Sequence, residues 1–356
     1  MPVTFRAATF NMENLFSRAR VLNLPDKAKA SAILDDIATL EQLLGKTTYT
    51  PADKTKILSL NKSLSQYIEI REDRGKLFTG SGAKQRVSAS GAGVWDGAVE
   101  FIRADITEEA RQSTADVVKA LNPHVLCTVE VENRPFLQKF NSQSLASKKF
   151  DYSMLIDAND PRGIDVGLLT RFEILNIRTH MFDRDPAGVI FSRDCLEVEL
   201  KLPDGRSLHM LCNHLKSQGY GSQAANDAKR RRQTVRLAQI LSRYNLATDL
   251  VIVAGDMNDD PASAALQPLL SVNNLFDVLQ LKFGNTMANR WTYKYRSTMN
   301  QIDFLLVSKP LKDGFKDAAI ERRGMFGAPG VTPFPSVTSA TNAASDHAGI
   351  WVEFQV

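Results

Sequence analysis

Polar and acidic side chains recur at the ends of apolar runs in this chain. The pairs are Asn11 with Glu13, Glu130 with Glu132, His214 with Lys216 and Asp256 with Asn258, and Asp303 and the pair Asp346 and His347 flank the last two runs. Strands of one core can deliver such residues to a common edge, where carboxylates suit a hard cation such as Mg²⁺. Phosphoester hydrolysis needs an activated water and charge neutralisation on the phosphate oxygens. The pattern is therefore typical of a metal site, and such a site would suit phosphoester hydrolysis.

Each of these features also has a purely structural interpretation. A glutamate after a strand is usually solvated, and the segment Gly255-Asp256-Met257-Asn258 is by itself most often a turn. The segment Ser345-Asp346-His347 fits an ordinary cap before a strand, and His214 fits a hydrogen-bonded core histidine. Only the whole set, in its order along the chain, favours chemistry.

The elements that position these residues are expected to be mostly strands. Runs typical of strands lie at residues 3–11, 124–131, 165–171, 196–202, 208–214, 250–256, 301–307 and 347–354. Helices are expected from Thr107 to the Asn122-Pro123 pair and at residues 224–245 and 262–270. Many buried strands with few helices predict two packed sheets covered by outer helices.

Six segments, in this order, resemble motifs of the endonuclease/exonuclease/phosphatase superfamily. They are Thr9-Phe10-Asn11-Met12-Glu13-Asn14-Leu15, Thr128-Val129-Glu130-Val131-Glu132-Asn133, Asn213-His214-Leu215-Lys216-Ser217, Gly255-Asp256-Met257-Asn258, Gln301-Ile302-Asp303-Phe304 and Ser345-Asp346-His347. The segment 162–166 also resembles a strand of bacterial members. The resemblance covers residues 4–16 and about 105–356. It implies a DNase I-like, four-layer α/β-sandwich of two packed mixed β-sheets flanked by helices, forming one domain over residues 1–356 with a helical insertion at about 17–104.

The resemblance implies a metal site that binds Mg²⁺ or Mn²⁺. Glu130 would be the principal ligand, and Glu13 would be a second or water-mediated ligand. Asp346 would bind or steer the metal, and Asn11 would orient the ligands or the phosphate. Oxygen donors of this kind suit both ions.

The resemblance also implies the catalytic residues. Asp256 would take a proton from the attacking water, and Asn258 would fix the phosphate beside it. Asp303 would hold His347 in one tautomer, so that His347 stabilises or protonates a phosphate oxygen. His214 would contact the phosphate or assist the leaving group.

Several cations are candidates for phosphate binding. Lys216 is the better candidate, because it lies within a motif. Arg162, which precedes the strand at 165–171, is a weaker candidate, as are Arg171 and Arg193. The basic run at 229–232, with Arg236, is compatible with a nucleic-acid backbone, although a solvated helix face is the favoured interpretation.

Three aromatic residues lie near the Asp303 motif. Trp291, Tyr293 and Tyr295 alternate with polar residues, so they could stack on bases. Their alternation favours one face of a strand packed on the core.

The segment from about 17 to 104 has no counterpart in the family pattern. Apolar residues at helical spacing predict a helical hairpin at its start, and the glycine-rich stretch at 75–97 predicts a mobile loop. Between residues 17 and 103 there are 14 Lys/Arg and 10 Asp/Glu, so this stretch accounts for the net charge of +4. It is expected to lie near the active-site rim and could bind a partner, mediate dimerisation or be a structural addition.

The leading functional hypothesis is a metal-dependent nuclease with DNA or RNA as substrate. The alternative is a phosphatase or phosphodiesterase for a small or lipid phosphoester, such as an inositol phosphate, sphingomyelin or a nucleotide messenger. A binding module that has lost catalysis is a third class, which the full set of acids and histidines disfavours.

No apolar run approaches the length of a membrane span, and no secretory leader is visible, so a cytoplasmic location is expected; a chain trimmed of its leader would look the same.

Overall fold

A computed structural model of the chain describes residues 2–13, 15, 18–24, 26–104, 108–160, 162–218, 222–295 and 298–356. Asn14 of the first motif and Ser17, at the start of the predicted insertion, lie outside these ranges. The chain divides into two compact units, one of residues Met1–Phe16 and Ile106–Val356 and one of Ser17–Asp105. Each unit is described by itself.

The first sheet of the larger unit joins the two ends of the chain. Its strand order is β21 (Phe315–Glu321), β22 (Gly349–Gln355), β1 (Thr4–Asn11), β8 (Val125–Val131), β10 (Asp165–Thr170) and β9 (Tyr152–Leu155). The pair β1 and β8 is parallel, and the other neighbours are antiparallel. The carboxyl ends of β1 and β8 therefore meet at one edge of the sheet.

The second sheet also contains one parallel pair. Its order is β11 (Glu173–Arg178), β14 (Cys195–Lys201), β15 (Ser207–His214), β16 (Leu250–Asp256), β20 (Asp303–Ser308) and β17 (Leu275–Asp277). The strands β15 and β16 are parallel, and β20 runs antiparallel to β16. The carboxyl ends of β15 and β16 and the amino end of β20 therefore share one edge.

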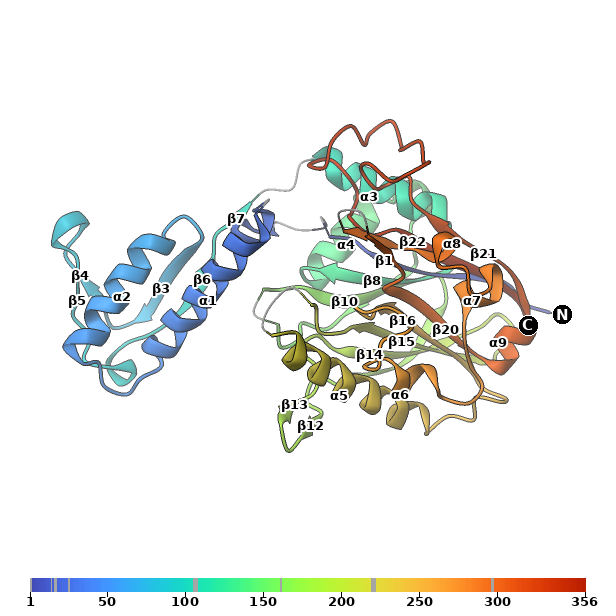
Figure 1. The fold of residues 1–356 in the computed structure, drawn as a ribbon, viewed down its shortest axis with the longest axis horizontal. Helices are drawn as coiled ribbons and strands as arrows, with labels where there is room; N and C mark the ends of the chain where they lie inside the picture. The colour runs from blue at the N-terminus through green and yellow to red at the C-terminus, as the bar shows by residue number, and fades with distance from the viewer. Residues whose placement is uncertain are drawn as a thin grey trace. The chain divides into compact units, whose positions relative to one another are not determined.

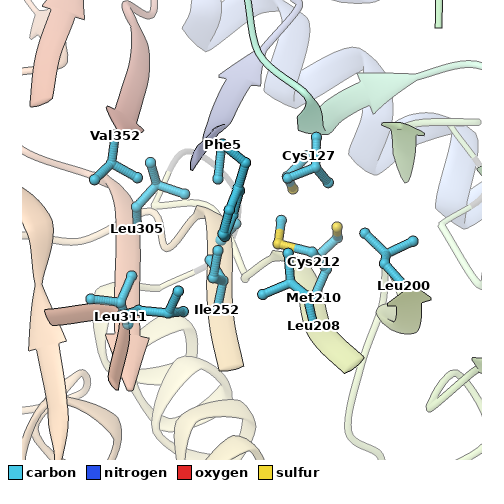
Figure 2. Packing of buried hydrophobic residues seen from close by; sticks show 14 of the residues in the cluster. Phe5, Cys127, Leu200, Leu208, Met210, Cys212, Ile252, Leu305, Leu311 and Val352 are labelled. Atoms are coloured by element: carbon cyan, nitrogen blue, oxygen red, sulfur yellow. The ribbon is translucent and has the colours of Figure 1, made fainter. Parts of the chain in front are cut away.

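The two sheets pack face to face through apolar side chains. Phe5 and Cys127 from the first sheet face Met210, Cys212 and Ile252 from the second (Figure 2). These side chains are fully buried. Their burial fixes which face of each strand points inward, because successive side chains alternate between the faces.

Helices cover the outer face of each sheet (Figure 1). The helices α3 (Glu108–Leu121) and α4 (Arg134–Gln143) pack on the first sheet through a second apolar cluster. The helices α5 (Gln223–Leu241) and α6 (Gln267–Leu270) pack on the second sheet through a third. The larger unit is thus the predicted four-layer α/β-sandwich of two mixed sheets between helices.

Several boundaries and elements differ from the sequence-based expectation. The helix expected at 262–270 is confined to α6, and β9, β11, β17 and β21 were not expected. The remaining elements of this unit are β12 (Arg184–Asp185), β13 (Gly188–Val189), α7 (Val278–Phe283), α8 (Met287–Arg290), β18 (Tyr293–Tyr295), β19 (Thr298–Asn300) and α9 (Lys309–Asp313). In the ranges that the structure describes, no helix has the length and apolar character that a bilayer span requires.

The smaller unit has its own apolar core. Its helices α1 (Lys27–Leu44) and α2 (Pro51–Leu64) form the predicted helical hairpin, and Thr50 caps α2 with Asp53 in a reciprocal capping box.

The prediction of a loop at 75–97 was wrong, because β3 (Ile68–Arg74) pairs with β6 (Asp96–Phe101), and β4 (Phe78–Thr79) pairs with β5 (Arg86–Val87). Trp95 is buried and donates its indole N–H to the Tyr49 hydroxyl, 2.9 Å away. Gly80 and Gly82 have positive φ in the connection between β4 and β5, whereas Gly97 lies within β6. The short strand β2 (Arg18–Ala19) pairs with β7 (Arg103–Ala104).

Candidate active site

The strand register brings the predicted site residues to one edge of the sandwich. In the first sheet, Asn11 pairs with Val129, so Asn11 and Glu130 lie at neighbouring strand ends. In the second sheet, Asp256 pairs with His214 on one side and with Asp303 on the other. The side-chain amide of Asn11 donates from Nδ2 to Asp256 Oδ2 at 3.1 Å, and this hydrogen bond joins the two sheets at this edge.

Asp303 and His347 form a buried pair. The His347 Nδ1 and Asp303 Oδ2 are 2.9 Å apart, which holds the imidazole with its Nε2 facing Asp256 Oδ2 at 3.9 Å. The backbone around this pair is fixed by Thr292, whose hydroxyl oxygen accepts from the N–H groups of Ile302 and Asp303 at 3.1 Å each. Thr292 could not be predicted from the sequence, because one threonine near a motif gives no signal in a single sequence.

Asp256 is a fully enclosed carboxylate of the site. Its Oδ1 accepts from the Asn258 backbone N–H at 2.7 Å, and its Oδ2 lies 3.6 Å from His214 Nε2. Burial raises the pKa of Asp256 to about 7; the positive charge of His347 lowers it, and Asp303 raises it further. A carboxyl group with such a pKa can exchange a proton near neutral pH.

The two histidines have opposite protonation preferences. Burial lowers the pKa of His214 well below its usual range, and the nearby Arg193 and Arg162 lower it further. Burial also opposes protonation of His347, but Asp303 and Asp256 outweigh it and raise the pKa of His347 well above its usual range. The neutral form of His214 is therefore favoured, whereas the carboxylates favour the imidazolium form of His347, which can donate from Nε2.

Glu130 is positioned by a bulge in β8. In the pairing with β10, Val131 lies opposite Asp165 and Val129 lies opposite Val166, so Glu130 is skipped. Its φ of 58° is left-handed, which is uncommon for a residue with a side chain. Bulges next to active sites redirect side chains, and here the Glu130 carboxylate lies 3.9 Å from His214 Nε2.

The remaining acidic residues lie beside His347. Glu13 Oε2 accepts from the Asp346 backbone N–H at 3.0 Å, and Asp346 Oδ1 lies 3.8 Å from His347 Nε2. Asp256, Asp303 and His347 also present one ligand atom each within 4.8 Å of one another. The residues predicted for catalysis or metal binding thus lie at this edge of the sandwich.

The predicted phosphate-binding cations lie toward His214. Lys216 is half-buried, and burial, then Arg193 and Arg162, lower its pKa to about 8. Arg162 forms a two-pronged ion pair with Asp160, with N–O distances of 2.8 and 2.6 Å. The fully buried Arg193 contacts the same carboxylate at 2.9 Å and donates to the Leu215 carbonyl at 3.0 Å. Arg193 therefore ties the segment that carries Arg162 to the chain beside His214 and Lys216.

Most arginines of the basic run of α5 are structural anchors, which differs from the favoured expectation of a solvated face, whereas Arg231 is exposed as expected. Arg230 is completely buried and pairs with Asp227 and Asp259. Arg232 pairs with Asp185, and Arg236 pairs with Asp183. These guanidinium groups hold α5 to neighbouring loops, because a buried cation requires an acidic or carbonyl partner.

The three aromatic residues have different environments. Trp291 is buried in a small cluster with Met325 and Ala348. Tyr293 is half-buried, with its ring centroid 4.8 Å from that of His347. Tyr295 is exposed, so the expectation that all three pack on the core was wrong for Tyr295.

Gly255 permits the close approach of β15 and β16 at the site. Its φ is 132°, and a Cβ there would lie 1.9 Å from the Asn213 carbonyl oxygen. We expect Gly255→Ala to lower the free energy of unfolding by about 2–5 kcal/mol and to reduce activity, because the strands that carry His214 and Asp256 must separate. Gly205→Ala is the matched control, since Gly205 has a φ of 90° but no neighbouring atom in the way. If urea denaturation gave the same decrease in unfolding free energy for both variants, this explanation of Gly255 would be wrong.

Comparison with known proteins gives one family and a set of solved structures. The chain matches the model of the Endonuclease/Exonuclease/phosphatase family over residues 105–320. It is similar to the human Nocturnin catalytic domain with bound sulfate anion (18% identity, 70% of this chain, 88% of that chain, TM-score 0.52). It is also similar to an endonuclease/exonuclease/phosphatase from Beutenbergia cavernae (17% identity, 71% of this chain, 67% of that chain, TM-score 0.51). A third similar structure is D. rerio TDP2 complexed with single strand DNA product (15% identity, 70% of this chain, 92% of that chain, TM-score 0.50). No curated protein matches its sequence. The solved structures confirm the predicted DNase I-like fold.

Proposed function

This chain belongs to the endonuclease/exonuclease/phosphatase family, and from this premise we propose that it is a metal-dependent phosphodiesterase that hydrolyses nucleic acid. The observation that carries the proposal is the meeting of Asp256, Asp303 and His347 at one buried edge, with His214 against Asp256. A carboxylate that can accept a proton beside an imidazolium that can donate one is suited to phosphoester hydrolysis.

In the proposed reaction, Asp256 accepts the proton of the attacking water at a carboxylate oxygen. Asn258, whose backbone N–H fixes the other Asp256 oxygen, holds the phosphate beside it. His347 donates from Nε2 to a phosphate oxygen, and Asp303 keeps that nitrogen directed at the substrate by occupying Nδ1. His214, whose pKa is lowered by burial, contacts the phosphate or the leaving oxygen.

The donor set fits a divalent cation of the magnesium type. Glu130, Glu13 and Asp346 would hold it, with Asn11 orienting them. The Asn11 Oδ1 is buried and has no hydrogen-bond partner among the residues that the structure describes, so it is an oxygen suited to a metal or its water. When bound, such an ion neutralises charge on the phosphate and lowers the pKa of a coordinated water.

A nucleic-acid substrate is supported by the cations on one side of this edge. Lys216 and Arg162 would bind substrate phosphates there, next to the buried Arg193. The similar D. rerio TDP2 was solved with a single strand DNA product, which supports a nucleic-acid substrate for this fold. Partner binding or dimerisation through the smaller unit stays a prediction, which light scattering would test.

We expect activity to require Mg²⁺ or Mn²⁺. Treatment with EDTA followed by its removal should abolish hydrolysis of bis-p-nitrophenyl phosphate and of DNA or RNA oligonucleotides, and either ion should restore it. Because phosphate contacts release counterions, oligonucleotide affinity should also fall steeply with salt. Full activity after chelation would refute the metal dependence.

The same assay separates the substrate classes. Turnover of inositol phosphates, sphingomyelin or a nucleotide messenger without cleavage of any nucleic acid would replace the nuclease by a small-phosphoester hydrolase. The cytoplasmic location stays a prediction, which imaging of a tagged chain would test.

A further inference from the structure

The hairpin of β18 and β19 is attached directly to the catalytic edge. Tyr293 forms a β-bridge with His347, and the Ala348 N–H donates to the Thr292 carbonyl at 2.7 Å. The Tyr293 ring packs on the His347 imidazole at an interplanar angle of 41°. The start of this hairpin is therefore fixed relative to His347.

Tyr295 continues the aromatic surface outward from Tyr293. The two side chains leave the same face of β18, and the strand rise separates them by about 7 Å. Tyr293 is half-buried, whereas 51% of Tyr295 is exposed.

The opposite face of the hairpin is anchored. Lys294 donates from Nζ to the Gly327 carbonyl at 3.1 Å. Trp291, just before β18, is buried with Met325 and Ala348, and the Arg322 guanidinium lies 4.2 Å from its ring centroid. Tyr295 is therefore a planar ring on a strand held through Trp291 and Lys294, and a tyrosine with its two side-chain torsions loses little conformational freedom when it binds.

We propose that Tyr295 is a stacking platform for an unpaired base next to the scissile phosphodiester, so that the substrate is single-stranded nucleic acid or a frayed end. This inference rests on the proposed nuclease function. The π-face of a base is accessible in a single strand and is covered by its neighbours in a duplex, so a tyrosine at this place favours the unpaired form. Stacking on an aromatic side chain tolerates any base, which predicts little sequence preference.

The test compares Tyr295→Ala, Tyr295→Leu and Tyr295→Trp with the wild type. The measured quantity is kcat/KM for single-stranded DNA and RNA oligonucleotides divided by kcat/KM for bis-p-nitrophenyl phosphate, which offers no base next to its phosphate. We expect this ratio to fall about tenfold in the alanine and leucine variants, mainly through KM, and to be retained with tryptophan. The alanine variant should also discriminate less between a single strand and the same DNA in a blunt duplex.

Phe326→Ala is the matched control. Phe326 is exposed to a similar extent, 54%, and its neighbour Gly327 contacts the opposite face of the hairpin through Lys294. Its loss should leave the ratio unchanged. An unchanged ratio in Tyr295→Ala, or full rescue by leucine, would overturn the stacking role while leaving the nuclease proposal intact. A wild-type enzyme that hydrolyses bis-p-nitrophenyl phosphate but no oligonucleotide would refute both.

Discussion

Asp256→Asn is expected to lower kcat by about 10²- to 10⁴-fold, since an amide cannot take the proton of the attacking water. The fold should be retained, because the substitution keeps the shape of the side chain. The thermal midpoint should stay equal or rise, because burial penalises the ionised carboxylate and raises its pKa to about 7. The measurements are kcat with bis-p-nitrophenyl phosphate and thermal unfolding of the same preparation.

Asp277→Asn is the control with the opposite expected outcome. Asp277 is also buried, but it pairs with Arg290 and accepts from Gln301 Nε2 at 3.0 Å, and neither of these partners has an assigned catalytic role. The asparagine variant should lose about 3 kcal/mol or more of unfolding free energy, because Arg290 is left without its counter-charge, and its kcat should be retained. Turnover of Asp256→Asn at the wild-type rate would refute the assignment of Asp256 as the base.

His347→Ala is expected to lower kcat by a similar factor, about 10²- to 10⁴-fold. The loss removes the imidazolium that the carboxylates of Asp303 and Asp256 stabilise. His209→Ala is the matched control, because His209 lies on β15 against the Tyr244 ring and has no place at the catalytic edge. Its variant should keep full activity in the same assay.

The pair Asp303 and His347 should behave as one unit. Asp303→Asn alone should reduce kcat, since the amide no longer selects the tautomer of His347 that presents Nε2 to the substrate. The double variant should have nearly the same kcat as His347→Ala, because the role of Asp303 depends on His347. Additive losses in this double-mutant cycle would show that Asp303 acts separately.

The larger features of the fold could be predicted from the sequence because the buried strands are continuous apolar runs. The strands at 250–256 and 208–214 were placed to within one residue, and their ends carry Asp256 and His214. Such runs have few alternatives, since they must be covered on both faces. Short elements such as β9 and α6 were missed or misplaced because their patterns are too brief to separate from loops.

The smaller unit shows where composition was misleading. Glycine and serine at 75–97 were interpreted as a loop, but Trp95, Leu77 and Val87 of this stretch are buried in the core of that unit. A glycine at a hairpin turn and a glycine in a flexible loop have the same sequence signal. Only the pairing of β3 with β6 distinguishes them.

The sequence by itself determined which residues stand at the ends of the strands, and their order identified the family and its four layers. Only the tertiary structure shows how these ends meet. A bulge in β8 directs Glu130 toward His214, and the Thr292 hydroxyl fixes the backbone before Asp303. The acidic partners of the α5 arginines also became apparent only in the folded chain. The reason is physical. Local pattern follows from burial of each strand's faces, whereas the position of a charged side chain depends on partners that are distant in sequence and adjacent only after folding.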